Sequence, residues 1–295
     1  MINRDKYNLI PKVLLTVLTV SGVAIFSGQT VTAQTNLQSY RVLVNSDRDT
    51  INPDQALTLR EAIEIVNNTL TWDDLSPVEQ KQVTVINQAQ ASRIEFALSA
   101  PVKIELQETL PPLLSPGLVI DGTTHPDYDP KKIATVEIPI PIPVVSLTAA
   151  EGKNVFRGLT ISGDRITVKG LSIYGFSQPN QPTDTTPGAD IVIGSRLPVS
   201  EDLSASLPDH SPQEVEIIDN WLGLPPDESI TEIPSSFGVW LFDGVNTKIQ
   251  RNRIEHHGGS AILTSVTAEK SKIKENIIVG NGLAGMPHAI YLEGQ

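Results

Sequence analysis

Two histidines near the end of the chain stand beside strand-like segments. His257 lies a few residues ahead of 261–264, and His288 lies directly ahead of the matching segment 289–292. Histidine changes its charge near neutral pH and binds transition metals, so the two suit acid–base chemistry or a metal site. However, no carboxylate keeps a fixed spacing to either histidine, and the glycine pair 258–259 is typical of a turn. Exposed turn histidines are therefore the alternative interpretation.

Acidic residues at matching places in these segments are candidates for glycoside hydrolysis. That reaction needs two carboxyl groups roughly 5 to 10 Å apart across the scissile bond. Asp243 and Glu293 occupy similar late positions, and Asp190 lies in an earlier segment. The chain carries a formal net charge of −12, so pairs of acids also arise by chance. These acids, together with His257 and His288, are the catalytic candidates.

An oxygen-rich stretch follows the apolar segment 118–120. Asp121, Asp127 and Asp129 supply carboxylate oxygens, which are the ligands that Ca²⁺ prefers. The spacing matches no recognised calcium loop, and a simple turn explains it equally well. Ca²⁺ is the cofactor that these three residues would hold.

Trp240 and Tyr291 occupy the same position in the segments 238–241 and 289–292. Alternation along a strand places both side chains on the outer face, two coils and about 10 Å apart. Aromatic rings spaced in this way offer stacking area to sugar rings. Long insertions flank these segments and would form the walls of a groove; they cover 176–189, 194–214 and 223–237. The alternative is that the insertions simply cover the rings.

Composition narrows the classes of partner. An acidic chain is repelled by nucleic acid and by anionic lipid. The chain has no cysteine, which excludes disulfides, thiol chemistry and lipid attachment at a cysteine. A basic cluster lies on the wrong face to hold a uronate in the groove, so we expect it to offset neighbouring acids. Its members are Lys248, Arg251, Arg253, Lys272 and Lys274.

The first 33 residues have the pattern of an export signal. Basic residues precede the apolar stretch 13–26, and Val31-Thr32-Ala33 supplies the small residues that signal peptidase needs. The apolar stretch is shorter than the roughly 20 residues that span a bilayer. We expect cleavage after Ala33 and no membrane span in the mature protein, which would be extracellular, periplasmic or attached to the cell surface. An uncleaved membrane anchor is the alternative.

Residues 34–92 are predicted to form a strand, at 40–44, and capping helices. Thr58 and Glu61 have the spacing of a capping box, which predicts a helix from Leu59 onward. The stretch 76–79, Ser-Pro-Val-Glu, has the same spacing and predicts a second helix. The first helix would cover the end of a stack of strands, where apolar core would otherwise face water.

Residues 93–295 are predicted to form a solenoid of short strands. Asn220, Asn252 and Asn276 lie 32 and then 24 residues apart, each with an apolar residue three positions before it and another two positions after it. Between these copies a second apolar pattern recurs, at 238–241, 261–264 and 289–292. Periods in the twenties indicate coils that bury one continuous core. We expect the asparagines to form a stacked amide ladder inside one bend.

Residues 57–62, Leu-Thr-Leu-Arg-Glu-Ala, resemble the Cys-Ser-Leu-Arg-Glu-Ala segment at the front of many exported β-helix proteins, with Leu57 in place of the cysteine. Residues 40–295 as a whole resemble the pectate-lyase-like right-handed parallel β-helix superfamily. The resemblance implies an all-β fold, a right-handed parallel β-helix (solenoid) with an N-terminal capping helix. It implies little about activity, because the superfamily includes lyases, hydrolases, epimerases and adhesins. Neither the Asp-rich hydrolase motifs nor the calcium-binding aspartates of pectate lyases are matched.

Two functions stay open at this point. The first is a secreted β-helix repeat protein that interacts with extracellular polysaccharide through Trp240 and Tyr291, with polysaccharide lyase or glycoside hydrolase activity as its enzymatic form. The second is a non-catalytic, adhesin-like structural protein of the cell surface. The chain stops directly after a strand-like segment, so we expect further coils or a partner to cover that end.

Overall fold

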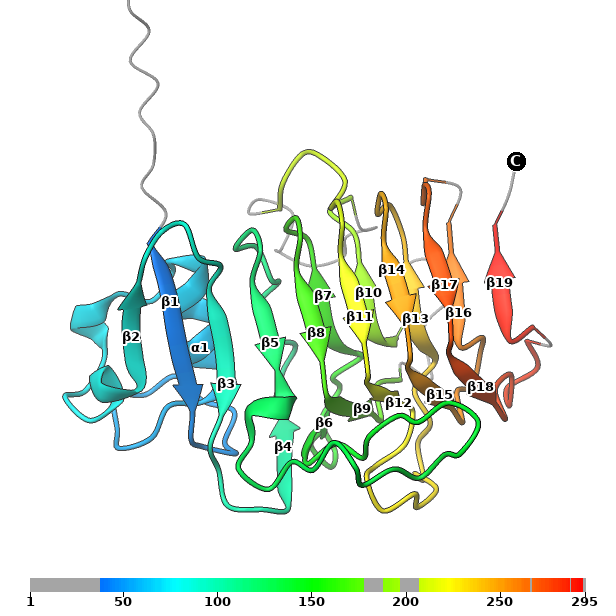
Figure 1. Cartoon of the computed structure of the whole chain (residues 1–295), viewed down its shortest axis with the longest axis horizontal. Coiled ribbons are helices and arrows are strands. Elements are labelled where there is room, and N and C mark those ends of the chain that lie inside the picture. Colours follow the sequence, from blue (N-terminus) through cyan, green and yellow to red (C-terminus); the bar gives the residue numbers. More distant parts are fainter. Residues whose placement is uncertain (1–37, 178–187, 197–206, 266, 287, 294–295) are drawn as a thin grey trace, which may run out of the picture. The chain divides into compact units, whose positions relative to one another are not determined.

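The computed structural model describes residues 38–177, 188–196, 207–265, 267–286 and 288–293. Their regular structure is mostly β-strand, arranged in three sheets (Figure 1). The described strand pairs are parallel, apart from the antiparallel pair β1–β2. The all-β class and the parallel arrangement predicted from the repeats are therefore confirmed.

Each sheet collects strands that recur along the chain. The eight-stranded sheet has the order β17-β14-β11-β8-β5-β3-β1-β2 and consists of β1 (Ser39–Val44), β2 (Val83–Ile86), β3 (Arg93–Phe96), β5 (Val119–Asp121), β8 (Thr167–Lys169), β11 (Glu216–Ile218), β14 (Lys248–Gln250) and β17 (Lys272–Lys274). The six-stranded sheet consists of β4 (Val102–Leu106), β6 (Val145–Ala149), β9 (Leu171–Tyr174), β12 (Trp221–Leu222), β15 (Arg253–Glu255) and β18 (Ile277–Val279). The five-stranded sheet consists of β7 (Arg157–Ile161), β10 (Ala189–Ile193), β13 (Phe237–Leu241), β16 (Ile262–Thr264) and β19 (Ile290–Leu292).

The pairing register confirms both predicted repeats. From β7 onward, consecutive strands lie in the five-, eight- and six-stranded sheets in turn. The apolar residues of the first repeat pair with one another; they are Val168, Ile217, Ile249 and Ile273. Those of the second repeat do the same; they are Val239, Ile262 and Ile290. Most of these side chains join one continuous hydrophobic core that extends back to β1.

A residue with left-handed backbone turns the chain just ahead of each asparagine of the repeat. Asp219, Arg251 and Glu275 have φ values of 55°, 56° and 55°. Gly170, with a φ of 68°, occupies the same place one repeat earlier. A single left-handed residue changes the direction of the backbone sharply. Each bend therefore passes the chain from the eight-stranded sheet to the six-stranded one.

The predicted amide ladder is present inside this bend. Asn252 Oδ1 accepts from the backbone N–H of Asn220 at 3.0 Å and from its side-chain amide at 3.1 Å. Asn276 Oδ1 accepts in the same way from Asn252, at 2.9 and 3.0 Å. At the other end, Asn220 Oδ1 accepts the backbone N–H of Leu171 at 3.1 Å. The ladder thus satisfies buried amides that no strand could reach.

Replacing Asn252 by leucine is expected to lower the free energy of unfolding by about 2–4 kcal/mol. Asn220 and Asn252 are fully buried, and the change removes the acceptor of the Asn220 backbone N–H and one of the donors to the Ile217 carbonyl. The same change at Asn276, which is only partly buried, should cost about half as much. Urea unfolding of both variants measures this. Equal losses of unfolding free energy in the two variants would contradict the larger contribution expected from Asn252, the middle residue of the ladder.

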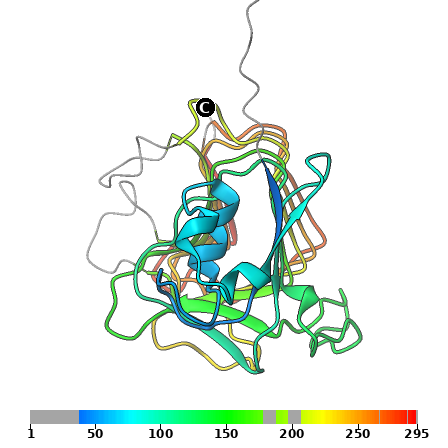
Figure 2. The ribbon, with the colours of Figure 1, turned by 90° about the vertical axis from the view of Figure 1, so that its left-hand side faces the viewer.

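One α-helix covers the first end of the stacked strands, as Figure 2 shows. Helix α1 (Leu59–Asn67) begins at Thr58, and both hydrogen bonds of the predicted capping box to Glu61 are present. Leu59, Ile63 and Val66 are buried in the main core. Among the described residues, no helix is long and apolar enough to cross a bilayer.

The second predicted helix is a single turn. Ser76 and Glu79 do form the expected reciprocal bonds, at 2.7 and 3.2 Å. Only the 3₁₀ turn η2 (Glu79–Gln82) follows, because the chain enters β2 directly through β-branched residues that favour a strand. The other 3₁₀ turns are η1 (Trp72–Asp74) and η3 (Gly122–Thr124).

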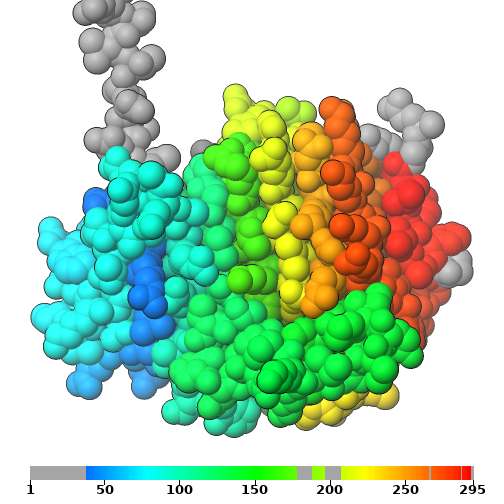
Figure 3. All heavy atoms as spheres, in the orientation of Figure 1, coloured from blue at the N-terminus to red at the C-terminus, as the bar shows by residue number. Residues whose placement is uncertain are grey.

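A long connection between η3 and β6 lies against the outside of the six-stranded sheet. Figure 3 shows this segment passing over later parts of the chain. Ile138, Ile140 and Ile142 alternate with prolines and pack around Trp221 and Leu224. Trp221, an outward residue of β12, is fully buried as a result. This face of the protein is therefore closed by the chain itself.

Candidate functional site

A buried polar cluster joins four side chains that are far apart in the sequence. Asp190 on β10 and His257 after β15 lie with 2.8 Å between Oδ2 and Nε2, and both side chains are 0% exposed. Ser235 donates its hydroxyl to the other oxygen of Asp190 and accepts the backbone N–H of Phe176 at 2.9 Å. Asn281 Oδ1 lies 2.7 Å from Nδ1 of His257. The cluster therefore links four successive passes of the chain.

Glycines make room for the His257 ring. A Cβ added at Gly223 would lie 2.6 Å from the ring and 1.8 Å from the Glu255 carbonyl oxygen. At Gly238 it would lie 3.1 Å from the ring and 2.5 Å from the carbonyl oxygen of Ala261. Such distances exclude any larger residue without a backbone shift. A glycine that opens a strand pattern, as Gly238 does, signals a close approach of this kind.

Asp190 lies where the alternation of β10 is interrupted. Ala189 packs with Val192 and Trp240 in an outer cluster, whereas Ile191 packs in the main core. Residues two apart on a regular strand share a face. Alternation from Val192 predicts an outward Asp190; the structure instead places it against His257 in the interior.

The hydrogen-bond geometry indicates which atoms of this cluster carry protons. The Asn281 amide nitrogen donates to the carbonyls of Ile254 and Val279, so its oxygen faces His257 and Nδ1 must carry a proton. One further proton is then shared between Nε2 and Asp190. Burial raises the pKa of the Asp190 carboxyl above its ordinary value of 3.8, and His257 opposes that rise. Because both groups are sealed from solvent, the cluster can hold these segments together but cannot reach a substrate.

Two further candidate acids, Asp243 and Asp121, are also buried and bonded within the protein. Asp243 is 1% exposed and accepts the backbone amides of Ser195 at 2.9 Å and Arg196 at 3.3 Å. Asp121 is 2% exposed and pairs with Arg93 at 2.8 Å and Lys169 at 2.9 Å. The oxygens that these two acids would lend to catalysis or to Ca²⁺ already have partners.

The remaining candidates are exposed. Asp127, Asp129, His288 and Glu293 are all on the surface. His288 lies beside Tyr291, with 5.7 Å between ring centroids, and is not brought into the cluster of His257. Within the described part of the chain, no group of three or more His, Asp or Glu side chains is placed to hold a metal ion.

The outward file on the five-stranded sheet has the expected register. Trp240 pairs with Leu263 and Leu263 pairs with Tyr291, so the two aromatic residues are two strands apart. Their exposure differs: Trp240 is 5% exposed and packs edge-on against Phe242 at 5.2 Å, whereas Tyr291 is 37% exposed. Only Tyr291 of the pair presents much of its ring to a ligand.

Three of the five members of the basic cluster pair with acids, as expected, whereas Lys272 and Lys274 have no ion pair among the described residues. Lys248 pairs with Glu216 at 3.3 Å and Arg251 pairs with Asp219 at 2.7 Å. Arg253 pairs with both Glu228 and Glu255, and its guanidinium lies 4.6 Å from the centre of the Trp221 ring.

No protein-family model matches this chain, and no curated protein matches it. Its function therefore has to be argued from its own geometry.

Proposed function

We propose that the chain is a right-handed parallel β-helix of the pectate-lyase-like kind, exported by the signal at 1–33. Three observations support the fold: strands that visit three parallel sheets in turn, an amide ladder in one bend, and a helix over the first end. The right-handed sense is proposed because connections between parallel strands are right-handed in nearly all proteins.

The proposed function is non-catalytic binding of an extracellular polysaccharide along the outer face of the five-stranded sheet. The observation that carries it is the in-register outward file Trp240–Leu263–Tyr291. Phe242 and Met286 pack beside this file, which makes an apolar stripe that ends at the exposed ring of Tyr291. Sugar rings have apolar faces that such a stripe accommodates.

Binding without cleavage is favoured by the burial and hydrogen bonding of the candidate carboxyl groups. Glycoside hydrolysis requires two carboxyl groups free to act across one bond. Asp190 and Asp243 are buried and hydrogen-bonded within the fold, which leaves exposed Glu293 without either as a partner.

An adhesin-like structural role is the second candidate. It is favoured by the burial of Trp240, which reduces the area offered to a sugar.

Tyr291→Ala is expected to weaken polysaccharide binding about tenfold, as the loss of one stacking contact implies. Isothermal titration against a panel of neutral and acidic polysaccharides measures this, with reducing-end assays for cleavage. Val136→Ala, at an 87% exposed position, is the control and should bind like wild type. Trp240→Ala is unsuitable because it removes a buried ring. Absence of binding to every polysaccharide would favour the structural role, and release of products would refute binding without cleavage.

A further inference from the structure

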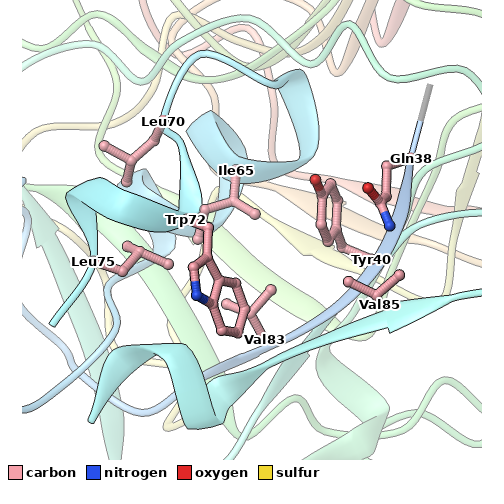
Figure 4. A pocket seen from close by; sticks show the side chains of 8 residues that line it. All are labelled: Gln38, Tyr40, Ile65, Leu70, Trp72, Leu75, Val83 and Val85. Carbon is pink, nitrogen blue, oxygen red and sulfur yellow. The ribbon is translucent and has the colours of Figure 1, made fainter. Parts of the chain in front are cut away.

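A cavity of about 380 Å³ lies within the N-terminal part of the fold. Helix α1, the turn η1 and the antiparallel strand pair β1–β2 surround it (Figure 4). Eight side chains line it: Gln38, Tyr40, Ile65, Leu70, Trp72, Leu75, Val83 and Val85. This volume is within the range of small-molecule sites, about 300–1,000 Å³.

The lining carries no charge, although the chain as a whole has a net charge of −12. Five of its side chains are aliphatic and two are aromatic; the Gln38 amide and the Tyr40 hydroxyl are its polar groups apart from the indole N–H. A charged ligand would lose its hydration here without gaining a counter-charge. An apolar ligand with one uncharged polar end matches this lining.

The cavity has a buried floor and exposed walls. Ile65, Leu75 and Val83 are 4%, 6% and 6% exposed, whereas Trp72 and Val85 are 48% and 52% exposed. The walls therefore expose apolar surface to water, and a bound ligand would cover that surface. Burial of that area is favourable by about 25 cal/mol per Å².

We propose that this cavity is a binding site for a small, uncharged, apolar molecule that contains a ring, held against the indole of Trp72. The site is separate from the outer face of the five-stranded sheet and does not depend on polysaccharide binding. Residues of α1, η1, β1 and β2 build it, so the region that covers the end of the strands also carries a ligand site.

Trp72 provides a direct readout. The chain has three tryptophans, and Trp221 and Trp240 are 0% and 5% exposed. Quenching of indole fluorescence by acrylamide therefore reports mainly on Trp72. The probe N-phenyl-1-naphthylamine is uncharged, and 8-anilinonaphthalene-1-sulfonate has the same ring framework with an added negative charge.

The uncharged probe is expected to bind the full chain at one site and to protect Trp72 from acrylamide. The sulfonate should bind at least tenfold more weakly. Trp72→Ala should weaken binding of the uncharged probe at least tenfold. Val85→Trp, which adds bulk at an exposed wall, should do the same without loss of fold. Val136→Trp adds an exposed indole in a distant segment and should leave binding unchanged. Equal binding of the two probes, no binding of the uncharged one, or binding that survives both cavity variants would overturn the proposal.

Discussion

Asp190→Ala is expected to lower the free energy of unfolding by about 3–5 kcal/mol. It removes the hydrogen-bond acceptor of two buried groups, and no water can replace the carboxylate. His257 Nε2 and the Ser235 hydroxyl both lose their acceptor, and Asp190 and Ser235 are fully buried. At roughly 2–4 °C per kcal/mol the melting temperature should fall by about 10 °C. Asp227→Ala removes an exposed carboxylate and is the control. Calorimetry measures both variants.

Asp190→Asn should retain most of that stability, within about 1 kcal/mol of wild type. The amide oxygen can accept from Ser235, and the amide nitrogen can donate to Nε2 of a neutral His257 that keeps its proton on Nδ1. A loss as large as that of Asp190→Ala would show that the charge, rather than the hydrogen bonds, holds the cluster.

The asparagine variant should also respond differently to pH. Burial raises the pKa of Asp190, so the folded protein keeps a proton that the unfolded chain releases near 3.8. This contribution to stability is complete below pH 3.8 and is lost as the pH rises through the raised pKa. Asparagine does not ionise, so the stability of Asp190→Asn relative to wild type should increase with pH across that window. Urea unfolding at a series of pH values tests this; a constant difference would contradict it.

Arg60→Met is expected to cost about 3–5 kcal/mol, because it leaves a carboxylate buried without its cation. Arg60 donates to both oxygens of Asp49 at 2.8 Å and to the backbone carbonyls of Glu108 and Thr109. The side chains of Arg60 and Asp49 are 6% and 1% exposed. These bonds attach α1 to the connection that follows β4. Hydrogen exchange in α1 and β1 should rise more than in β13.

Arg48→Met is the matched control for this variant. Arg48 pairs with Asp54 at 3.1 Å, but its side chain is 68% exposed, so its loss should cost no more than about 1 kcal/mol. Arg60→Met combined with Asp49→Leu removes both charges and should recover part of the stability. If Arg60→Met is no more destabilising than Arg48→Met, the bonds to Asp49 do not hold the helix in place.

Local chemistry allowed several elements to be predicted. The Thr58–Glu61 capping box needs only four consecutive residues, and α1 begins where that box places it. The ladder of Asn220, Asn252 and Asn276 was predictable because each sequence repeat forms the same bend, so an asparagine at the same place in each repeat can bond to the next one. The segment 76–79 shows the limit of such local rules, since its box forms but the chain continues into β2.

The role of Arg60 was not predicted, although the capping box formed by its neighbours Thr58 and Glu61 was. Its partners Asp49, Glu108 and Thr109 belong to connections without periodic pattern. Nothing in the spacing of such segments says which of them will lie against a helix. The resemblance of 57–62 to a known segment includes Arg60 but assigns it no partner.

Periodic burial and local hydrogen bonds specify the two strand repeats of the later part of the chain, their pairing register and the start of α1, so these features follow from the sequence. Which polar residues meet depends on the tertiary structure. Asp190 and His257 are 67 residues apart, and they meet because alternation is interrupted in β10 and glycines at 223 and 238 leave space for the ring. Exposure was likewise decided by packing, since Trp240 and Tyr291 share one file but differ in the side chains that cover them. Contacts of this kind depend on how segments far apart in the sequence pack in three dimensions, which no local pattern encodes.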